Sequence, residues 1–580
     1  EVDPSKLVYK AMDERIAKAA KGDKDSGIIT TAGKGVYGTT VIVVSDPESG
    51  YVSRIRVRTR PKDAVASPMI SAGSEFMLAL KYDGTVWTWG KNNVGQLGNT
   101  KLPAKGANVP KQVMAGAQQS SDSYLHDIIR IAAGVDFAIA LDKTGGIWTW
   151  GNNANGRLGR TGAANLPAKL DSVASYRFVD IAAGYASGFA IRKNGTVYSW
   201  GYNALGQLGI GNIKEQSAPV RVRGGSTGTT YLEDTVQIAP GYFHTLALKA
   251  NGSVFAFGSG QWGQLGNGVY SEATGVYHNV VLDAKVYNTP IQVLKGAQTT
   301  SKSGYLENVV ELAAAGGYGE VRTQQISSAR TVYKYTGTSL AVTEDGTVYG
   351  WGDSHYGALG NRNKRNPNPI RVSTGAIGIS VGGVGNSEIK GSPDFPYEDL
   401  YEKHTNGSYI YTQVLKKDGT IETRGYGAHG EKGHGAIEAE NYYATVRKVS
   451  GLTDVLQISA ASDYYHVAAV KADGTVWTWG LNSSGQLGNG TYKGDGDNAE
   501  RTTPLQVGGS SGNAMKLRQG ALLDENGGTI EKYGDKDLIT NIDIADGQSF
   551  RIDGRDADGN TLIKVTTSFS LLLADAEVDP

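Results

Sequence analysis

Hydrophobic and polar residues alternate in short segments along most of the chain. In Val86-Trp87-Thr88-Trp89 both indoles fall at every second position, which places them on one face of a β-strand. A turn dipeptide, Asp83-Gly84, precedes this segment, and another apolar segment precedes the turn. Such dipeptides accept the positive φ of a type I′ turn, so we expect two antiparallel strands joined by a two-residue turn. The pattern therefore predicts an all-β protein built from hairpins.

This pattern occurs seven times. A short strand ending in Ala-Gly opens most copies, and a Gly-x-Leu-Gly loop leads to a fourth strand of Pro-x-x-Val type. Four short strands per copy leave exposed sheet edges unless the copies are arranged radially, so we predict a seven-bladed β-propeller. The Trp-Gly position or its equivalent falls at Trp89, Trp150, Trp200, Phe257, Trp351, Arg424 and Trp479.

At these residues the chain resembles the regulator of chromosome condensation repeat family. The shared motifs are Ala-Gly, Asp-Gly-Thr-Val-Trp-x-Trp-Gly and Gly-Gln-Leu-Gly, and the resemblance covers residues 64–509. It implies the seven-bladed propeller of that family. Family members include exchange factors for small GTPases, chromatin-binding proteins and a secreted bacterial β-lactamase inhibitor, but no motif here carries one of those activities over. In the sixth copy Arg424 replaces the tryptophan, so we expect polar contacts or looser packing there.

The aromatic residues hold the same strand position in nearly every copy, so we interpret them as packing residues between neighbouring blades rather than as a sugar-stacking surface. Removing one is expected to cost about 3–5 kcal/mol. The tryptophans assigned to this packing role are Trp89, Trp150, Trp200, Trp351 and Trp479.

The two ends of the chain are similar to the two halves of a bacterial immunoglobulin-like domain of group 2. Gly38-Thr39-Thr40-Val41-Ile42 near the start resembles that family's second half, and Leu538-x-Thr540-x-Ile542-x-Ile544 near the end fits its opening strands. We therefore predict three segments: 1–62 and 515–580 as the halves of an immunoglobulin-like β-sandwich, and 64–509 as the propeller.

Two arrangements of these halves are open. Successive units could complete the sandwich between them, or the two ends of one chain could associate beside the propeller. An incomplete sandwich exposes unpaired edge strands that invite completion by a neighbour, which favours the first arrangement.

The composition narrows the possible partners and location. Lys+Arg and Asp+Glu are 57 each, and this zero net charge argues against nucleic acid as a partner. The chain has no cysteine, which excludes disulfides and cysteine-ligated zinc and suits an extracellular protein of a bacterial cell surface. No apolar run reaches the roughly 18 residues of a membrane-spanning helix, so we expect no membrane span.

No motif identifies a catalytic or cofactor site, so we expect neither an enzyme nor a cofactor. We interpret His244 and His466 as buried hydrogen-bonding residues. His429 and His434 lie close together in a Gly-rich loop of the sixth copy, where a metal site is conceivable but not favoured, since only Glu431 is nearby. Asp556, Asp558 and Asn560 resemble a calcium loop but lack its later glutamate, so a β-turn is favoured and no metal is assigned.

Insertions in the fifth and sixth copies are candidate contact loops. They lie around residues 318–335 and 384–408, on the same rim of adjacent blades. The alternative is neutral decoration, which loops tolerate at little entropic cost. The interaction residues assigned to these loops are Tyr318, Tyr335, Tyr397 and Tyr401.

Together these features predict a structural repeat unit of a bacterial extracellular fibre or surface stalk. Its partners would be copies of itself, joined head to tail by completion of the immunoglobulin-like sandwich. The alternative is a surface adhesin or inhibitor-type binding module that presents a propeller face to a host or cell-wall protein or glycan. A hydrolase or lyase in the propeller channel is the least favoured function, since no catalytic constellation is present.

Overall fold

The computed structural model of the chain describes eighteen stretches of it. These are residues 6–21, 26–32, 36–61, 64–118, 123–225, 230–270, 286–323, 330–361, 363, 365–384, 409–438, 445–492, 500–508, 514–517, 532–533, 541–545, 549–553 and 564–567.

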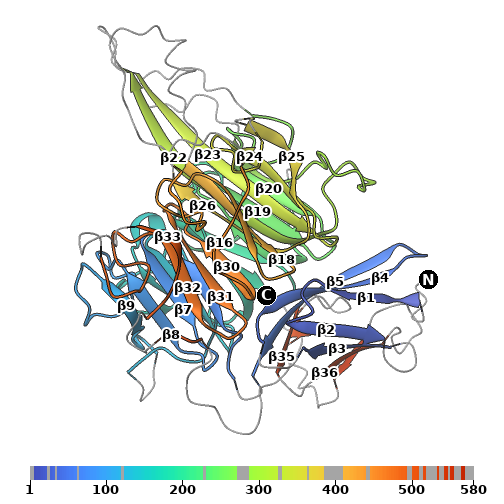
Figure 1. Ribbon diagram of the computed structural model, residues 1–580, viewed down its shortest axis with the longest axis horizontal. Coiled ribbons are helices and arrows are strands. Elements are labelled where there is room, and N and C mark those ends of the chain that lie inside the picture. Colours follow the sequence, from blue (N-terminus) through green and yellow to red (C-terminus); the bar gives the residue numbers. More distant parts are fainter. Residues whose placement is uncertain are drawn as a thin grey trace.

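Seven antiparallel sheets, each made of four consecutive strands, form the larger part of the molecule (Figure 1). Their first strands are β6 (Met69–Ala72), β10 (Ile128–Ala133), β14 (Phe178–Ala183), β18 (Thr235–Pro240), β22 (Val309–Thr323), β26 (Ala376–Val384) and β30 (Val455–Ala460). Their second strands are β7 (Phe76–Leu80), β11 (Phe137–Asp142), β15 (Ser187–Arg192), β19 (His244–Lys249), β23 (Arg330–Thr343), β27 (Tyr409–Lys416) and β31 (His466–Lys471). Their third strands are β8 (Val86–Gly90), β12 (Ile147–Gly151), β16 (Val197–Gly201), β20 (Val254–Ser259), β24 (Val348–Asp353), β28 (Ile421–Gly425) and β32 (Val476–Leu481). Their fourth strands are β9 (Ala107–Gln112), β13 (Ala168–Lys169), β17 (Gln216–Arg221), β21 (Val286–Gln292), β25 (Arg365–Ser373), β29 (Arg447–Lys448) and β33 (Glu500–Gln506).

The seven sheets are arranged as a β-propeller. The first strand of each sheet contacts the first strand of the next, and β30 of the seventh sheet contacts β6 of the first. At this junction the backbone N–H of Ile70 donates to Gln457 Oε1 at 3.1 Å, and that of Ala72 donates to Ser459 Oγ at 3.0 Å. Each described sheet remains open at its edges, so contacts between sheets, and not a shared strand, close the ring.

The turns between second and third strands differ from the predicted two-residue type I′ form. In the first sheet, the Gly84 N–H donates to the Lys81 carbonyl at 3.0 Å, and the Lys81 N–H donates to Thr85. Only Gly84 has a positive φ, of 79°, whereas Asp83 does not. The connection is therefore a three-residue loop in which a type I turn is followed by a left-handed glycine. Asp83 instead accepts the Thr85 N–H through its carboxylate, at 3.0 Å.

The insertion of the fifth sheet is a hairpin extension rather than the predicted loop. Strands β22 and β23 stay paired from Val309–Thr343 to Thr323–Arg330, and Tyr318 lies opposite Tyr335. This hairpin projects from the propeller at the end remote from the chain's terminal strands (Figure 1). The insertion at 385–408 lies outside the described residues.

The N-terminal and C-terminal strands form a second, two-sheet part, here called the terminal unit. One sheet has the order β1-β4-β5-β35-β34, and the other has the order β2-β3-β36-β37. Leu7, Ile29, Ile42 and Val57 belong to the apolar core that the two sheets share. The strands are β1 (Val8–Ala11), β2 (Ala17–Lys21), β3 (Ser26–Thr31), β4 (Thr39–Asp46), β5 (Tyr51–Arg60), β34 (Lys532–Tyr533), β35 (Asn541–Ala545), β36 (Ser549–Asp553) and β37 (Lys564–Thr567).

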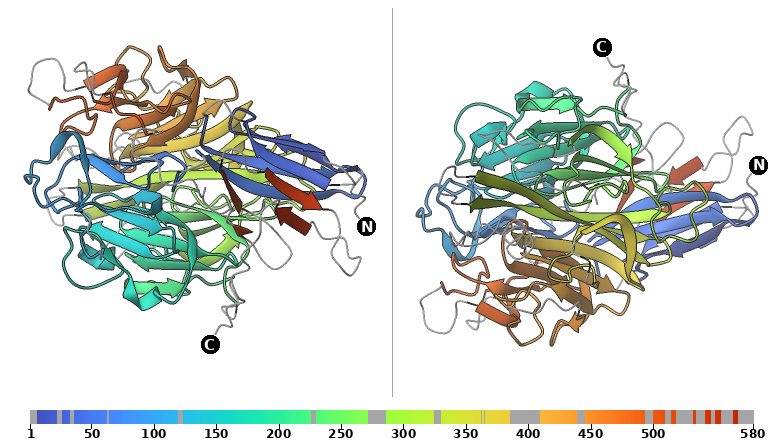
Figure 2. Two further views of the ribbon diagram at one scale, coloured as in Figure 1. Left: turned by 90° about the horizontal axis from the view of Figure 1, so that it is seen from below. Right: turned by 90° about the horizontal axis from the view of Figure 1, so that it is seen from above.

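The two ends pair within one chain. Strand β3 is antiparallel to β36, and β5 is parallel to β35 (Figure 2). The favoured prediction, completion of the unit by a neighbouring chain, is therefore wrong for this structure. The physical reason is that the propeller returns the chain to its starting side, so the closest edges available to the C-terminal strands are those of the same chain.

Helix is nearly absent from the described residues, which contain two 3-10 turns, η2 (Ala154–Gly156) and η3 (Asp171–Val173). No helix in this part of the chain is long and apolar enough to cross a membrane.

Candidate protein-binding face

The tryptophans of the Trp-Gly motif lie at the interfaces between sheets. Trp89 is fully buried, and its indole N–H donates to the Gln486 carbonyl of the seventh sheet at 2.9 Å. Gly488, at φ 65°, lies against this indole, where a Cβ would come within 2.7 Å of Trp89 Nε1. The same contact to the loop of the preceding sheet recurs at 2.9 to 3.1 Å for Trp150, Trp200, Trp351 and Trp479.

At the two interfaces that lack this tryptophan, threonine hydroxyls donate to carbonyls of the preceding sheet. Thr245 donates to the Gln207 carbonyl at 2.9 Å, and Thr412 donates to the Ala358 carbonyl at 2.7 Å. In the sixth sheet, Arg424 takes the tryptophan position and is buried, with its guanidinium 3.0 Å from Glu422. The contacts of Arg424 in this divergent sheet are therefore polar. This agrees with one of the two expectations for the sixth copy.

The terminal unit covers one face of the propeller. Arginines at alternate positions of β5 point toward the first strands of the sheets. Arg58 forms an ion pair with Asp180 at 2.7 Å, and Arg56 donates to Gln237 Oε1 at 3.0 Å. The two parts also share an apolar core in which Met12, Val41 and Val43 of the terminal unit join residues of the fifth and sixth sheets.

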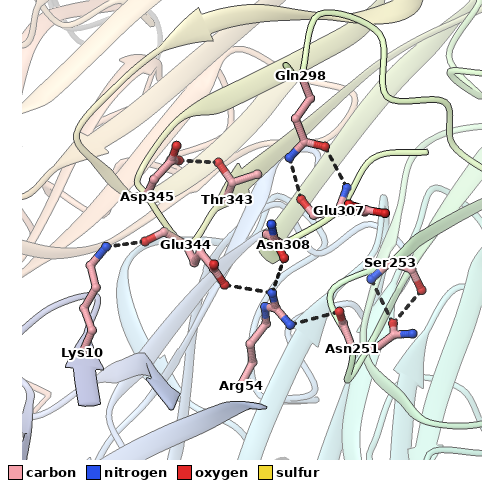
Figure 3. Close-up of polar contacts among 10 residues, drawn as sticks. All are labelled: Lys10, Arg54, Asn251, Ser253, Gln298, Glu307, Asn308, Thr343, Glu344 and Asp345. Atoms are coloured by element: carbon pink, nitrogen blue, oxygen red, sulfur yellow. Dashed lines mark hydrogen bonds and ion pairs between the residues drawn. The ribbon is translucent and has the colours of Figure 1, made fainter. Parts of the chain in front are cut away.

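Arg54 makes the densest of these contacts (Figure 3). Its guanidinium donates to the Asn251 carbonyl at 3.0 Å, to Asn308 Oδ1 at 2.6 Å and to Glu344 Oε2 at 2.8 Å. Lys10 donates to the Glu344 carbonyl at 2.7 Å. Since these acceptors lie in turns of the fourth and fifth sheets, one arginine fixes the terminal unit against two sheets at once.

A cavity of about 270 Å³ lies between the terminal unit and the propeller. It is lined by equivalent positions of the first strands, including Arg130, Asp180, Gln237 and Glu311. Burial raises the pKa of Glu311 to about 7, and the nearby positive charge of Arg56 only partly opposes this shift. The terminal unit therefore closes this end of the propeller over a small polar space.

The opposite face carries aromatic side chains. First strands begin at the covered face, so the loops that follow first and third strands lie at the other end. Tyr185 and Tyr242 stack there with ring centroids 3.6 Å apart, and Phe243 contacts Tyr202 at 6.2 Å and Tyr335 at 5.0 Å. Leu205 joins this group.

A second aromatic group lies on the same face, on the fifth, sixth and seventh sheets. The ring of Tyr409 lies 5.3 Å from Tyr356, 4.5 Å from Tyr426 and 6.5 Å from Tyr465. Tyr464 continues it, 5.8 Å from Tyr465. We call both groups together the aromatic face, which comprises Tyr185, Tyr202, Tyr242, Phe243, Tyr335, Tyr356, Tyr409, Tyr426, Tyr464 and Tyr465.

Three carboxylates lie in the loops after the first strands of the first, second and seventh sheets. Glu75 pairs with Lys91, and Asp136 pairs with Arg157 at 2.6 Å. Burial raises the pKa of Asp463 to about 7, and the negative charges of Asp136 and Glu75 add to this shift. Asp463 is half-buried and therefore gives the aromatic face a carboxyl group whose protonated form is favoured.

The predicted interaction residues are only partly placed. Tyr335 is buried in the first aromatic group, whereas Tyr397 and Tyr401 lie outside the described residues, and of Tyr318 only the backbone is described. The other members of the aromatic face were not predicted from the sequence. The feature that could have identified them is the pair of aromatic residues that follows the first strand in several copies, as in Tyr242-Phe243 and Tyr464-Tyr465.

The histidines and the candidate metal residues occupy different surroundings. His244 is fully buried and shares a hydrogen bond with Ser339 at 2.9 Å, and burial lowers its pKa to about 3. His466 is equally buried, but its ring nitrogens have no partner within the described residues, contrary to the expected hydrogen bond. The described residues contain no metal-binding group of three or more His, Cys, Asp or Glu. The predicted turn with Asp556, Asp558 and Asn560 lies outside them.

The ring of seven similar sheets, packed through one repeated contact, defines a β-propeller protein. Residues 22–386 match the RCC1-like domain, and residues 455–486 and 473–520 match the regulator of chromosome condensation repeat. The chain belongs to the RCC1-like family. This confirms the propeller part of the predicted resemblance, whereas these matches do not show the predicted immunoglobulin-like halves.

Two relatives are each 26% identical to this chain over the aligned residues. The Ultraviolet-B receptor UVR8 of Arabidopsis thaliana is 26% identical over 77% of this chain and 72% of its own. The human E3 ubiquitin-protein ligase HERC2 is 26% identical over 72% of this chain, but the match spans only 7% of HERC2. Among solved structures, yeast RCC1 (Prp20) bound to Kap60 has a TM-score of 0.53 and 21% identity, covering 75% of this chain and 86% of that one. This last likeness shows the fold alone.

These comparisons contradict the predicted function. The related proteins are a receptor, a ligase and an RCC1 protein that binds Kap60, and none is described as a fibre or stalk unit. The prediction of a bacterial fibre unit joined head to tail is therefore wrong. The prediction failed because the two half-domains were expected to pair between neighbouring chains, whereas their strands pair within one chain.

Proposed function

We propose that this protein is a binding propeller that presents its aromatic face to a protein partner while its own terminal unit occupies the opposite face. The difference between the two faces supports this most directly. One face is closed by Arg54, Arg56 and Arg58, and the other carries ten aromatic side chains gathered from several sheets.

The chemistry of the aromatic face suits a protein partner. Tyrosine combines a large apolar ring with a polar hydroxyl and few rotatable bonds, and it is enriched at the energetic centres of protein interfaces. The ring contacts among Tyr185, Tyr242 and Phe243 hold these side chains in place before binding, so little conformational entropy is lost on association. The proposal assigns no catalytic step to the propeller.

A photo-crosslinking experiment tests this function. We would place p-benzoylphenylalanine at the half-buried Tyr202 and, as a control, at the exposed Lys18 of the terminal unit. In the native cells, illumination is expected to give a discrete protein adduct from position 202 and none from position 18. Adducts from position 18 alone, or from neither 202 nor a second site at Tyr426, would contradict the proposal.

We also propose that the terminal unit is the immunoglobulin-like sandwich expected from the sequence, serving here as an internal cap. Its two sheets with a shared core support this, as does its contact with the propeller through β5. An extracellular position at a bacterial surface stays a prediction, which protease treatment of intact cells would test.

A further inference from the structure

Glutamine occupies one position of the loop that follows the third strand in four of the sheets. These residues are Gln96, Gln207, Gln264 and Gln486. In each of them the side-chain Oε1 accepts the backbone N–H of the residue two positions earlier, at 2.7 to 3.0 Å. In the sixth sheet Glu431 takes this position, and its Oε2 accepts the His429 N–H at 2.8 Å. A carboxyl group therefore replaces the amide in an otherwise unchanged contact.

The side chain of Glu431 is enclosed. It is fully buried, and its second oxygen, Oε1, has no hydrogen-bond partner within the described residues. Its backbone carbonyl accepts the Trp479 indole N–H at 2.9 Å and the Gln413 side-chain amide at 3.1 Å. These bonds fix the residue between the sixth and seventh sheets. A carboxylate in such surroundings is costly unless a cation pairs with it, whereas the protonated acid is neutral like the glutamine of the other sheets.

The charged groups that act on Glu431 are engaged with other partners. Lys432, on the same loop, forms an ion pair with Glu438. Glu500, in β33, lies 2.8 Å from His429 Nδ1 and adds a negative charge. The positive charge of Lys432 therefore compensates an ionised Glu431 only in part.

Burial is the main reason that the pKa of Glu431 is raised to about 7. The hydrogen bond from the His429 N–H and the charge of Lys432 oppose this shift without cancelling it. The titratable groups that face Glu431 from other elements are Tyr411 of β27 and Tyr465 of the seventh sheet, and the charge of Glu431 contributes to raising the pKa of both. Both hydroxyls therefore stay protonated at neutral pH.

The loop that carries Glu431 also carries part of the aromatic face. It comprises residues 426–433 and is here called the 426–433 loop. Tyr426 holds the position that Tyr202 has in the third sheet, and its ring lies 5.7 Å from that of Tyr465. The His429 ring lies 4.5 Å from the Tyr465 ring. A displacement of Glu431 toward water therefore also moves Tyr426 and His429 away from the seventh sheet.

We propose that Glu431 is a pH switch for partner binding at the aromatic face: its protonated side chain holds the 426–433 loop against the seventh sheet, and its ionisation releases the loop. This inference rests on the proposed function and names a regulation of the same face. An ionised Glu431 regains its hydration only when the loop moves outward. The pKa of Glu431 is about 7 with the loop in place and near 4.5 when the carboxyl group is exposed. The ratio of released to held loop therefore rises up to about tenfold for each pH unit between 4.5 and 7, and then levels off.

Hydrogen exchange followed by mass spectrometry tests the loop directly. Exchange is measured between about pH 5 and pH 8 and is divided by the intrinsic rate at each pH. In the wild type, protection of the 426–433 loop is expected to fall by up to about tenfold per pH unit until pH 7 and then to level off. Glu431→Gln, which introduces the residue of the other sheets, should keep the protection constant although His429 retains its imidazole. The equivalent loop 481–488, which contains Gln486, is the internal control and should not respond.

The reciprocal substitution, Gln486→Glu, is the matched variant. In the part of the chain that the structure describes, Gln486 Nε2 is buried without a hydrogen-bond partner, so an acid at this position loses no contact. Gln486→Glu should show wild-type protection at about pH 5, where the acid is protonated. As the pH rises to 7, the loss of protection should appear in the 481–488 loop as well.

Partner binding is the second readout. The partner captured by the crosslink from position 202 is titrated at about pH 5.5 and pH 7.5. Wild-type affinity is expected to be at least about threefold lower at the higher pH, because part of the protein then has a released loop. In Glu431→Gln this difference should disappear.

Three outcomes would overturn the inference. The first is constant protection of the 426–433 loop in the wild type, and the second is an equal loss of protection in Glu431→Gln. The third is a loop that is released without any change in affinity. The proposed function fails separately: if neither position 202 nor position 426 gives an adduct, the aromatic face binds no partner, whatever the loop does.

Discussion

Arginines at positions 54, 56, 58 and 60 alternate along β5, a spacing that on its own is typical of a solvated strand face. In the structure this face lies against the propeller. Arg54 and Arg58 are buried, and both are ion-paired. Burying a guanidinium is tolerated only when most of its N–H groups find acceptors, and Arg54 has three. At the scale of single residues, polar contacts thus determine which face the terminal unit covers.

Arg54→Ala is expected to lower the free energy of unfolding by about 2–3 kcal/mol, because it removes three hydrogen bonds of a buried guanidinium and leaves the part-buried Asn308 and Glu344 without their donor. Urea denaturation measures this change, and limited proteolysis should show earlier cleavage in the terminal unit.

Lys6→Gln is the control for Arg54→Ala. The ion pair between Lys6 and Glu48 is exposed, so its loss should cost no more than about 1 kcal/mol. Equal effects of the two substitutions would show that the contacts of Arg54 contribute nothing specific.

Residue patterns in the sequence reveal repeated positions better than unique ones. Trp89 and its equivalents could be assigned a packing role because a periodic strand position repeats in most copies. Glu311 could not be found in this way, since the surroundings that raise its pKa come from neighbouring sheets and from the terminal unit. Arg54 was missed for the same reason, because its partners lie about 200 to 290 residues away.

At the scale of elements, each four-stranded sheet is contiguous in sequence, and the same indole contact recurs at five of the seven junctions. The indole of one third strand donates to a carbonyl in the loop of the preceding sheet, and a glycine makes room for the ring. The strand order was predictable because hairpin turns and alternation are local signals. The turn type and the length of the β22–β23 hairpin were not predictable. Both depend on backbone geometry, which the turn dipeptides permit but do not determine.

Trp89→Phe is expected to destabilise the protein by about 1–3 kcal/mol, since it keeps most of the buried ring but leaves the Gln486 carbonyl without its donor. Trp89→Ala should cost about 3–5 kcal/mol, because it also creates a cavity at the junction of the first and seventh sheets. Chemical denaturation followed by tryptophan fluorescence gives both values.

Trp87→Phe provides the comparison on the same strand. Trp87 is half-buried and donates to Thr85 within its own sheet. A loss as large as that of Trp89→Phe would mean that the contact between sheets is not what matters.

At the scale of the whole molecule, the terminal unit and the propeller behave as one folding body, because they share an apolar core and enclose the polar cavity around Glu311. The chain leaves the propeller only after Met515 and Leu517, which pack with the first and seventh sheets. The two halves of the terminal unit were recognisable as strands. Their pairing within one chain was not, because strand patterns carry no information about which chain supplies the partner.

The buried Glu311 predicts a pH dependence of stability. Its pKa is about 7 in the folded protein and near 4.5 when exposed, so its contribution is fully present below about pH 4.5 and is lost as the pH rises to 7. Glu311→Gln should remove this loss. The variant should therefore gain stability relative to the wild type between pH 4.5 and 7, as measured by urea denaturation at several pH values.

Glu233→Gln is the control for that experiment, because Glu233 is exposed beside the start of β18. Its stability profile should follow the wild type throughout. A Glu311→Gln profile parallel to both would show that the cavity does not disfavour the charged carboxylate.

The pairing of β3 with β36 and of β5 with β35 has a kinetic consequence for the ring. Consecutive sheets are linked directly along the chain, whereas the first and seventh sheets are not, so their junction is the place where the ring can part. When it does, the two sides remain tethered through the terminal unit, and their effective concentration stays high. Opening is then a brief intramolecular fluctuation that reverses before the blades can separate or exchange with another molecule.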